Sequence, residues 1–122
     1  MIQILVVGAG GFVGAVARYL ISLFTISETI LFPVKTFFVN VIGCILIGII
    51  SVVVSKNTSC NPQLILFLKV GVCGGFTTFS TFALETTALL KDGHILMGFL
   101  YVFLSVLVGV FVVFAIDLLL AK

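Results

Sequence analysis

The stretch from Gly74 to Phe82 reads GGFTTFSTF and combines paired glycines with four hydroxyl and three phenyl side chains, without a single charge. Long apolar runs flank it on both sides. Paired glycines and adjacent threonines weaken helix propensity, and Ser and Thr side chains can satisfy the backbone groups that a helix break leaves free. The stretch therefore predicts an interruption in a helix that the flanking sequence would otherwise continue.

The composition of the whole chain predicts an integral membrane protein. Of its 122 residues, 62% are hydrophobic and 8% are charged, whereas a soluble domain carries about 25% charged residues. The formal net charge of +2 comes without a basic run, so nucleic acid is not an expected partner. No basic region precedes the first apolar stretch, which favours a retained first helix over a cleaved signal peptide.

Four apolar segments, separated by short polar breaks, predict a single domain of four transmembrane helices. The third segment begins at Pro62, a residue that suits the first turn of a helix, and it is longer than the ~20 residues that a bilayer requires. A helix broken in mid-membrane at GGFTTFSTF would absorb the excess. The expected fold is therefore all-α and membrane-embedded, with helices at about residues 2–24, 32–54, 62–90 and 95–120.

Lysine and arginine are balanced between the two sides of such a four-helix domain. Orientation normally follows an excess of these residues on the cytoplasmic side, and here neither side has one. We therefore expect the chain to insert in both directions, so that two opposed copies can pair about a two-fold axis in the membrane plane. One side would hold Lys56, Lys69 and Lys122, and the other Arg18, Lys35 and Lys91.

The first segment contains a helix-packing pattern and a charge. Gly10 and Gly14 form a small-xxx-small pair, which lets helix backbones approach closely in lipid. A dinucleotide-binding reading fails because Val13 stands where the third glycine of G-x-G-x-x-G belongs. Arg18 is costly inside a membrane. It either extends to the interface or attracts anions near a pore mouth, and the sequence leaves both interpretations open.

Two polar stripes run along the second and fourth segments at helical spacing. Asn40 belongs to the first stripe, and a buried amide must find hydrogen-bond partners. It could serve as a contact between helices or as a site for a solute. Together with the hydroxyl-rich break, the stripes are typical of the walls of a narrow polar path. The first stripe consists of Thr36, Asn40, Cys44 and Gly48, and the second of Tyr101, Ser105 and Gly109.

The predicted break itself could bind ions of either sign. Carbonyls freed in a discontinuous helix can coordinate a cation. Phe79 and Phe82, three residues apart, would share one side of a resumed helix, and the electropositive edges of their rings can face a small anion. The alternative is a packing kink with core phenylalanines. Glu85, one turn further on, could end a hydrogen-bond chain or pair with a cation.

No set of residues predicts catalysis. His94 has no nucleophile or carboxylate at a recognisable spacing, and the three cysteines, Cys44, Cys60 and Cys73, lack metal-ligand spacing. We expect the cysteines to be packing residues or inert thiols, and Asp117 to lie at the membrane interface. An enzyme is the least favoured class of protein.

The motifs taken together resemble the Fluc (CrcB) family of fluoride channels. The matching stretches are GGFVGAVARY, TFFVNVIG and, most specifically, GVCGGFTTFSTF, in the first, second and third segments. The resemblance covers the whole chain in number of spans and order of motifs. It implies an antiparallel, dual-topology homodimer in the plasma membrane, with two fluoride pores and a sodium ion (Na+) buried at the dimer centre.

The resemblance also assigns roles to residues of this chain. Gly74 and Thr77 match the positions whose backbone carbonyls hold sodium. Lys35 departs from the family pattern, which usually has Gly before the second-span threonine, Thr36, and it would alter the charge of the vestibule or the entry of the helix. The implied fluoride path comprises Asn40, Phe79, Ser80, Thr81, Phe82, Tyr101 and Ser105, with Thr36 from the polar stripe, and Arg18 and Glu85 as charged positions.

The expected function is therefore passive export of fluoride that enters the cell as hydrogen fluoride, which would confer fluoride resistance. The expected partners are fluoride ion, membrane lipid and a second copy of the chain. A small multidrug transporter is an alternative, but such proteins place a carboxylate in the first span, where this chain has Arg18 and no acid. A second alternative is a non-transporting membrane assembly subunit whose polar stripes only join helices.

Overall fold

A computed structural model describes residues 1–122 and contains helices but no strands. Four helical segments are long and apolar enough to cross a membrane. This confirms the predicted all-α fold with four spans, and the chain is a multi-pass membrane protein. The four segments are α1 (Ile2–Ser22), α2 (Val34–Lys56), the composite third span (Pro62–Lys91) and α6 (Ile95–Leu120).

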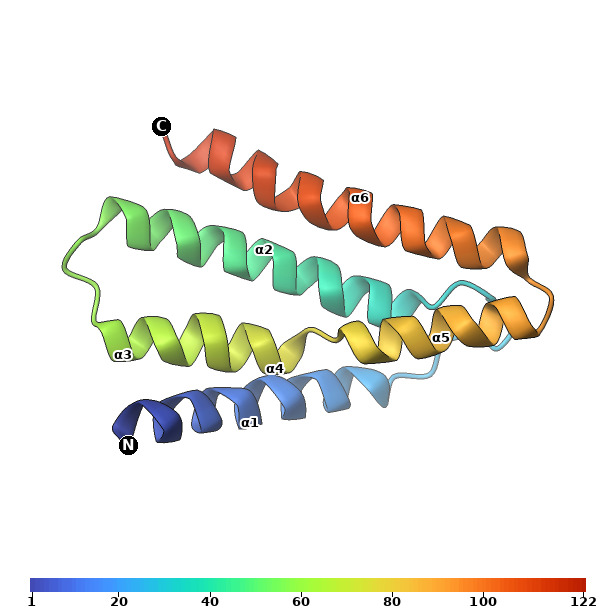
Figure 1. Cartoon of the computed structure of the whole chain (residues 1–122), viewed down its shortest axis with the longest axis horizontal. Coiled ribbons are helices and arrows are strands. Elements are labelled where there is room, and N and C mark those ends of the chain that lie inside the picture. Colours follow the sequence, from blue (N-terminus) through green and yellow to red (C-terminus); the bar gives the residue numbers. More distant parts are fainter.

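The third span is not a single regular helix. It consists of α3 (Pro62–Ile65), the π-helix η1 (Leu66–Cys73), α4 (Gly74–Phe76) and α5 (Phe79–Lys91). Asn61 caps its start by accepting a hydrogen bond from the Gln63 N–H at 2.9 Å, and Pro62 occupies the first turn. Between α4 and α5, Thr77 and Thr78 have extended backbone conformations. Figure 1 shows this short connection in the GGFTTFSTF stretch.

The helices lie side by side with the third span in a central position (Figure 1). Helix α1 lies beside η1 and α4, while α2 separates this half of the third span from α6. Both termini and the α2–α3 connection are at one end of the bundle, and the other two connections are at the opposite end. The turn between α5 and α6 contains Gly93, whose φ of +83° favours glycine.

Glycines allow α1 to contact the third span backbone to backbone. Gly10 and Gly14 are the two buried residues of α1, and a Cβ on Gly14 would collide with the carbonyl oxygen of Val72. From the other side, a Cβ on Gly75 would lie 2.5 Å from the Gly11 oxygen. The predicted packing role of Gly10 and Gly14 is therefore confirmed, because only hydrogen fits between these backbones.

The polar stripe of α2 faces its neighbours in the bundle. Cys44 lies against Gly109 of α6, where a Cβ would be 3.3 Å from its sulfur. One turn on, Gly48 faces Ile116 of the same helix. Toward the other end of α2, Thr36 is buried with 7% of its surface exposed. The spacing of four residues has thus placed the stripe on one inward-facing side of the helix, as predicted.

Candidate functional site

Asn40 of α2 supplies the hydrogen bonds that the extended backbone at the break requires. Its Oδ1 accepts from the Thr78 N–H at 2.8 Å, and its Nδ2 donates to the Thr78 carbonyl at 3.1 Å. The Thr78 hydroxyl in turn accepts from the Thr81 N–H at 3.2 Å and so caps the start of α5. These bonds stabilise an interruption that would otherwise leave buried polar groups unpaired.

The break also changes the surroundings of two backbone carbonyls. In a continuous helix the Thr78 N–H would donate to the carbonyl of Gly74, but here it donates to Asn40. The Thr77 N–H and hydroxyl both donate to the Cys73 carbonyl, at 3.1 and 2.9 Å. The Thr77 carbonyl itself accepts no hydrogen bond within the chain. Oxygen atoms of this kind are the ligands that hard cations prefer.

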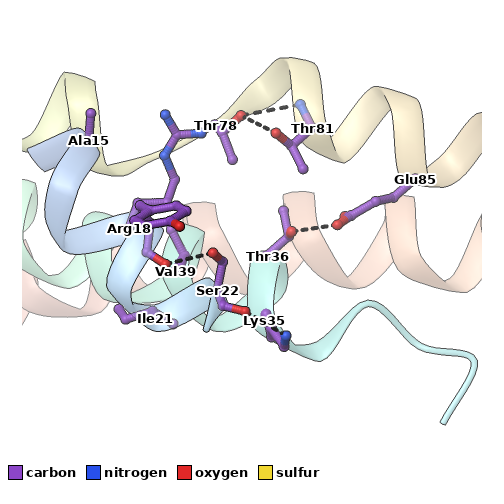
Figure 2. A pocket seen from close by; sticks show the side chains of 11 residues that line it. Ala15, Arg18, Ile21, Ser22, Lys35, Thr36, Val39, Thr78, Thr81 and Glu85 are labelled. Carbon is purple, nitrogen blue, oxygen red and sulfur yellow. Dashed lines mark hydrogen bonds between the residues drawn. The ribbon is translucent and has the colours of Figure 1, made fainter. Parts of the chain in front are cut away.

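A first cavity of about 480 Å³ lies between α1, the start of α2 and the start of α5 (Figure 2). Its lining contains two basic side chains, Arg18 and Lys35, and one acidic side chain, Glu85. Lys35 Nζ donates to the carbonyl of Ser22 at 2.8 Å, whereas Arg18 Nε is buried without a hydrogen-bond partner. The lining therefore has a formal charge of plus one, from two cations and one carboxylate.

Glu85 joins three helices through its two carboxylate oxygens. The Thr36 hydroxyl donates to Oε1 at 2.7 Å, a bond drawn in Figure 2, and the Tyr101 hydroxyl donates to Oε2 at 2.8 Å. Tyr101 is completely buried. Of the two roles that the sequence left open for Glu85, the structure shows the hydrogen-bond chain, with partners on α2 and α6.

A second cavity of about 400 Å³ lies on the other side of the break. Thr78 lines both cavities, so they flank the residue to which Asn40 is hydrogen-bonded. No acidic residue lines the second cavity, and its one formal charge is the ammonium of Lys69. Ser105, another member of its lining, has a buried hydroxyl without a partner. The predicted site residues in this lining are Asn40, Gly74, Thr77, Phe79, Phe82 and Ser105.

The phenylalanines of the break continue into a series of aromatic contacts. The ring centroids of Phe79 and Phe82 are 5.6 Å apart, and Phe82 meets Tyr101 edge-on with centroids 5.0 Å apart. Tyr101 then makes a second edge contact with Phe32 at 5.3 Å. Phe79 stands at the open end of the series with 80% of its surface exposed. Most of the ring is therefore free to contact another molecule.

A more apolar groove of about 670 Å³ extends from the second cavity along α2 and α6. Cys44, Ser105 and Val106 line both spaces, and Asp117 lies at the far end of the groove near the C-terminus of α6. Members of both stripes line these spaces, but Tyr101 lines none of them. The first and second cavities share Thr78 in their linings, and the second cavity and the groove share Ser105.

The site residues expected from the sequence do not all line the same cavity. Arg18, Thr36, Thr81 and Glu85 line the first cavity. Tyr101 lines neither cavity and reaches the site through Glu85, and Ser80 is exposed and outside both linings. Sequence reasoning left out Thr78, although it lies in the quoted stretch. It also left out Lys69, which was considered only for membrane orientation.

Comparisons with known proteins identify similar sequences. A family model described as "CrcB-like protein, Camphor Resistance (CrcB)" matches residues 5–116. A fluoride-specific ion channel FluC from Prosthecochloris aestuarii (strain DSM 271 / SK 413) is 51% identical over 107 residues, which are 87% of this chain and 83% of that protein. These matches confirm the resemblance that GVCGGFTTFSTF suggested.

Two further proteins of the same name extend the comparison. One from Chlorobium chlorochromatii (strain CaD3) is 47% identical over 107 residues, covering 88% of this chain and 83% of that protein. One from Chlorobium luteolum (strain DSM 273 / BCRC 81028 / 2530) is 43% identical over 121 residues, covering 99% and 93%. The similarity therefore includes all four spans.

Proposed function

The chain belongs to the CrcB family, and we propose that it is a passive fluoride channel that exports fluoride from the cytoplasm of a bacterial cell. The names of the relatives support fluoride as the ion. The observation that carries the proposal is that Thr78 lies between two cavities, and the lining of each has a net positive formal charge. An ion channel performs no covalent chemistry, in agreement with the expectation that the chain is not an enzyme.

The residues of the first cavity would act on fluoride before it reaches the break. Arg18 and Lys35 provide the positive charge that draws an anion from water into a cleft. Hydroxyl and amide donors around Thr78 would then replace part of the hydration shell of the ion. A negative membrane potential drives anions out of the cell, and moving one charge is worth about 2.3 kcal/mol per 100 mV. Passive flow is therefore sufficient to lower internal fluoride and to confer resistance.

The proposal includes a dual-topology homodimer with two pores and a helix break in mid-membrane. Balanced Lys and Arg residues support insertion in both directions. The openness of both cavities in a single chain supports a partner at the break, because a pore needs walls on all sides. A second, antiparallel copy would supply the missing walls and create two equivalent pores.

A sodium ion at the dimer centre is a further part of the proposal. The donor set fits, because the break diverts the usual hydrogen-bond donor of the Gly74 carbonyl and leaves the Thr77 carbonyl without one. Gly74 is exposed, and the space around its Cβ position is open. Sodium would supply positive charge that holds these carbonyls together with those of the second copy. Replacing sodium with N-methylglucamine should then weaken the dimer, which single-molecule photobleaching in liposomes would measure.

Efflux from liposomes tests the proposed function. Purified protein is reconstituted with internal potassium fluoride or potassium chloride, and valinomycin starts the efflux by carrying potassium. Fluoride release well above that of protein-free liposomes, with negligible chloride release, is the expected result. Export of a lipophilic cation under a proton gradient would instead favour the multidrug transporter. No flux of any ion from a folded dimer would favour the assembly subunit.

A further inference from the structure

The connection between α1 and α2, residues 23–33, lies against the part of the site that contains Glu85. A third cavity of about 320 Å³ is lined mainly by this connection, together with the start of α2 and Glu85. Two charged residues, Lys35 and Glu85, line both this cavity and the first cavity. The proposed fluoride path uses no residue of the connection, although the connection borders two of its charged groups.

Phe32, near the end of this connection, is held in place by the residues that follow it. Pro33 is the N-cap of α2, and a proline restricts the residue before it to extended conformations. The ring of Phe32 meets that of Phe37 edge-on, with centroids 5.3 Å apart. Phe32 and Phe37 occupy the N′ and N4 positions around the N-cap, which is the spacing of a hydrophobic staple. The staple fixes the direction in which the connection enters α2.

The same ring supports Tyr101 of α6. Tyr101 is completely buried, and its ring has two edge contacts, with Phe82 at 5.0 Å and with Phe32 at 5.3 Å. One contact comes from α5 and the other from the connection, so two separate elements fix the position of the ring. The Tyr101 hydroxyl lies 2.8 Å from Glu85 Oε2. Hydrogen bonds between oxygens extend only to about 3.0 Å, so a displaced ring would lose this bond.

Glu85 accepts its hydrogen bonds from hydroxyls although cations line the same cavities. Its two oxygens accept from Thr36 and Tyr101, while Lys35 Nζ donates to the Ser22 carbonyl at 2.8 Å. In Figure 2 the Glu85 carboxylate reaches Thr36, and Lys35 lies beside Ser22. Ser22 ends α1, and a cation is favoured at a helix C-terminus. A carboxylate that lost a hydroxyl donor would instead be attracted to the nearby ammonium.

From these contacts we infer that Phe32 is a positioning residue for the ion path. Its ring holds Tyr101 so that the tyrosine hydroxyl occupies Glu85, and this keeps the carboxylate from pairing with Lys35. The charge of Lys35 then stays available to an anion in the first cavity. The effect on fluoride rests on the proposed function, whereas the coupling of Phe32 to Glu85 through Tyr101 does not. The α1–α2 connection thereby serves the path without touching the ion.

Tyrosine fluorescence tests this coupling without any transport. The chain has two tyrosines and no tryptophan, so Tyr101 is the main emitter in a Tyr19→Phe background. A tyrosine that donates a hydrogen bond to a carboxylate is quenched relative to one that does not. Phe32→Ala and Phe32→Val should therefore raise the emission toward that of a Glu85→Gln reference. Phe32→Met should stay near the parent, because methionine is flexible and packs well on aromatic rings. Unchanged emission in the Ala and Val variants would overturn the inference.

The variants include controls for loss of packing or fold. Valine suits the extended backbone before a proline and keeps an apolar group in the staple, but it is too short to replace the ring. Phe38→Val is the matched control, because Phe38 also contacts Phe37, at 6.0 Å, and is more than half exposed. Gel filtration and thermal unfolding would verify the fold of each variant. If Phe38→Val raised the emission as much as Phe32→Val, the specific role of Phe32 would be wrong.

Fluoride efflux from liposomes tests the consequence for Lys35. At low internal fluoride, Phe32→Val should be slower than the wild type by roughly threefold to tenfold, because a neutralised lysine lowers the local anion concentration. The rates should converge at saturating fluoride. In a Lys35→Gln background, Phe32→Val should change the rate by less than about twofold, since no ammonium is left for Glu85 to neutralise. An equal loss with and without Lys35 would refute the link to that lysine.

The two measurements separate the role of Phe32 from the proposed function. If wild-type liposomes release no fluoride, the proposed function fails, but an emission that depends on Phe32 would still support the positioning of Tyr101 on Glu85. If the wild type conducts fluoride and the Phe32 variants neither raise the emission nor slow the efflux, the positioning role alone is wrong.

Discussion

Asn40 and Thr78 are joined by two reciprocal hydrogen bonds, in which the side-chain amide of one residue pairs with the backbone N–H and C=O of the other. The amide thereby takes the place of the backbone groups that a continuous helix would provide. Thr78 is buried, with 8% of its surface exposed, so its backbone N–H and C=O need hydrogen-bond partners. The shape of the break thus depends on one side chain of a neighbouring helix.

Replacing Asn40 should destabilise the helix break and with it the folded protein. Asn40→Ala leaves the Thr78 N–H and C=O unpaired, and we expect the free energy of unfolding in mixed micelles to fall by about 1–3 kcal/mol. Asn40→Asp keeps the acceptor for the Thr78 N–H but loses the donor to the Thr78 carbonyl. The hydrogen bond of the Thr78 N–H should therefore be less affected than in Asn40→Ala. Asn57→Ala, which removes only an exposed hydrogen bond from the Ser59 N–H, is the control. Equal stability of Asn40→Ala and wild type would show that the two hydrogen bonds between Asn40 and Thr78 contribute nothing to the free energy of unfolding.

Gly14 should not tolerate even a methyl group. A Cβ at this position would meet the backbone oxygen of Val72 and lie 2.7 Å from the backbone nitrogen of Phe76, and neither atom can rotate away. We expect Gly14→Ala to separate α1 from the third span and to lower the free energy of unfolding by about 1–3 kcal/mol.

Gly8→Ala is the matched control for this prediction. Gly8 lies on the same helix with no atom near its Cβ position, so the substitution should be neutral or stabilising by up to ~1 kcal/mol through helix propensity. Similar unfolding free energies for the two variants would contradict the close backbone contact.

Several features of the fold were predictable from the sequence, because periodic patterns determine which face of a helix is buried. The spacing of Gly10 and Gly14, and of Thr36 and Asn40, is a property of the sequence and requires no knowledge of the partner helix. The number of spans follows in the same way from the lengths of the apolar runs. Predictions of this kind succeed because they depend on local geometry alone.

Partners and local helix type could not be predicted. The partner of Asn40 is a backbone segment 38 residues away, and many hydroxyls and carbonyls could have served as well. Nothing in LFLKVGVC distinguishes a π-helix from an α-helix. Ser80 lies outside both cavities because α5 resumes at Phe79 and its direction is fixed by packing.

The two donors to Glu85 should be energetically coupled. Thr36→Val and Tyr101→Phe each remove one hydroxyl while keeping the size of the side chain, and each leaves the carboxylate with a single donor. Their combination leaves it with none, so we expect the double variant to lose more stability than the sum of the single losses, with a coupling of about 0.5–3 kcal/mol.

A double-mutant cycle in mixed micelles would measure this coupling. Thr87→Val is the control partner, since the Thr87 hydroxyl donates to the Ala83 carbonyl of its own helix at 2.9 Å and does not reach Glu85. Additive losses for Thr36→Val and Tyr101→Phe would mean that the two hydrogen bonds are independent.

Membrane orientation should respond to a few added charges. Lys and Arg are balanced across the bundle, so fluorescent and phosphatase reporters at the C-terminus should both be active in cells. Asn57→Lys combined with Thr58→Lys, in the exposed α2–α3 connection, should shift the population toward an orientation with that loop in the cytoplasm. Co-expression with an oppositely biased variant should restore flux. A single orientation of the unmodified chain would contradict dual topology.

Phe82→Ile should reduce fluoride flux while leaving the fold intact. Phe82 lines the second cavity and contacts both Phe79 and Tyr101 through its ring. Isoleucine keeps the apolar character but has no electropositive ring edge to face an anion. We expect the rate of fluoride efflux from liposomes to fall at least tenfold, since a shift of only ~1.4 kcal/mol in the barrier has that effect. Phe103→Ile, on the exposed face of α6, is the control and should conduct as the wild type does. Undiminished flux through a folded Phe82→Ile dimer would remove Phe82 from the proposed fluoride path.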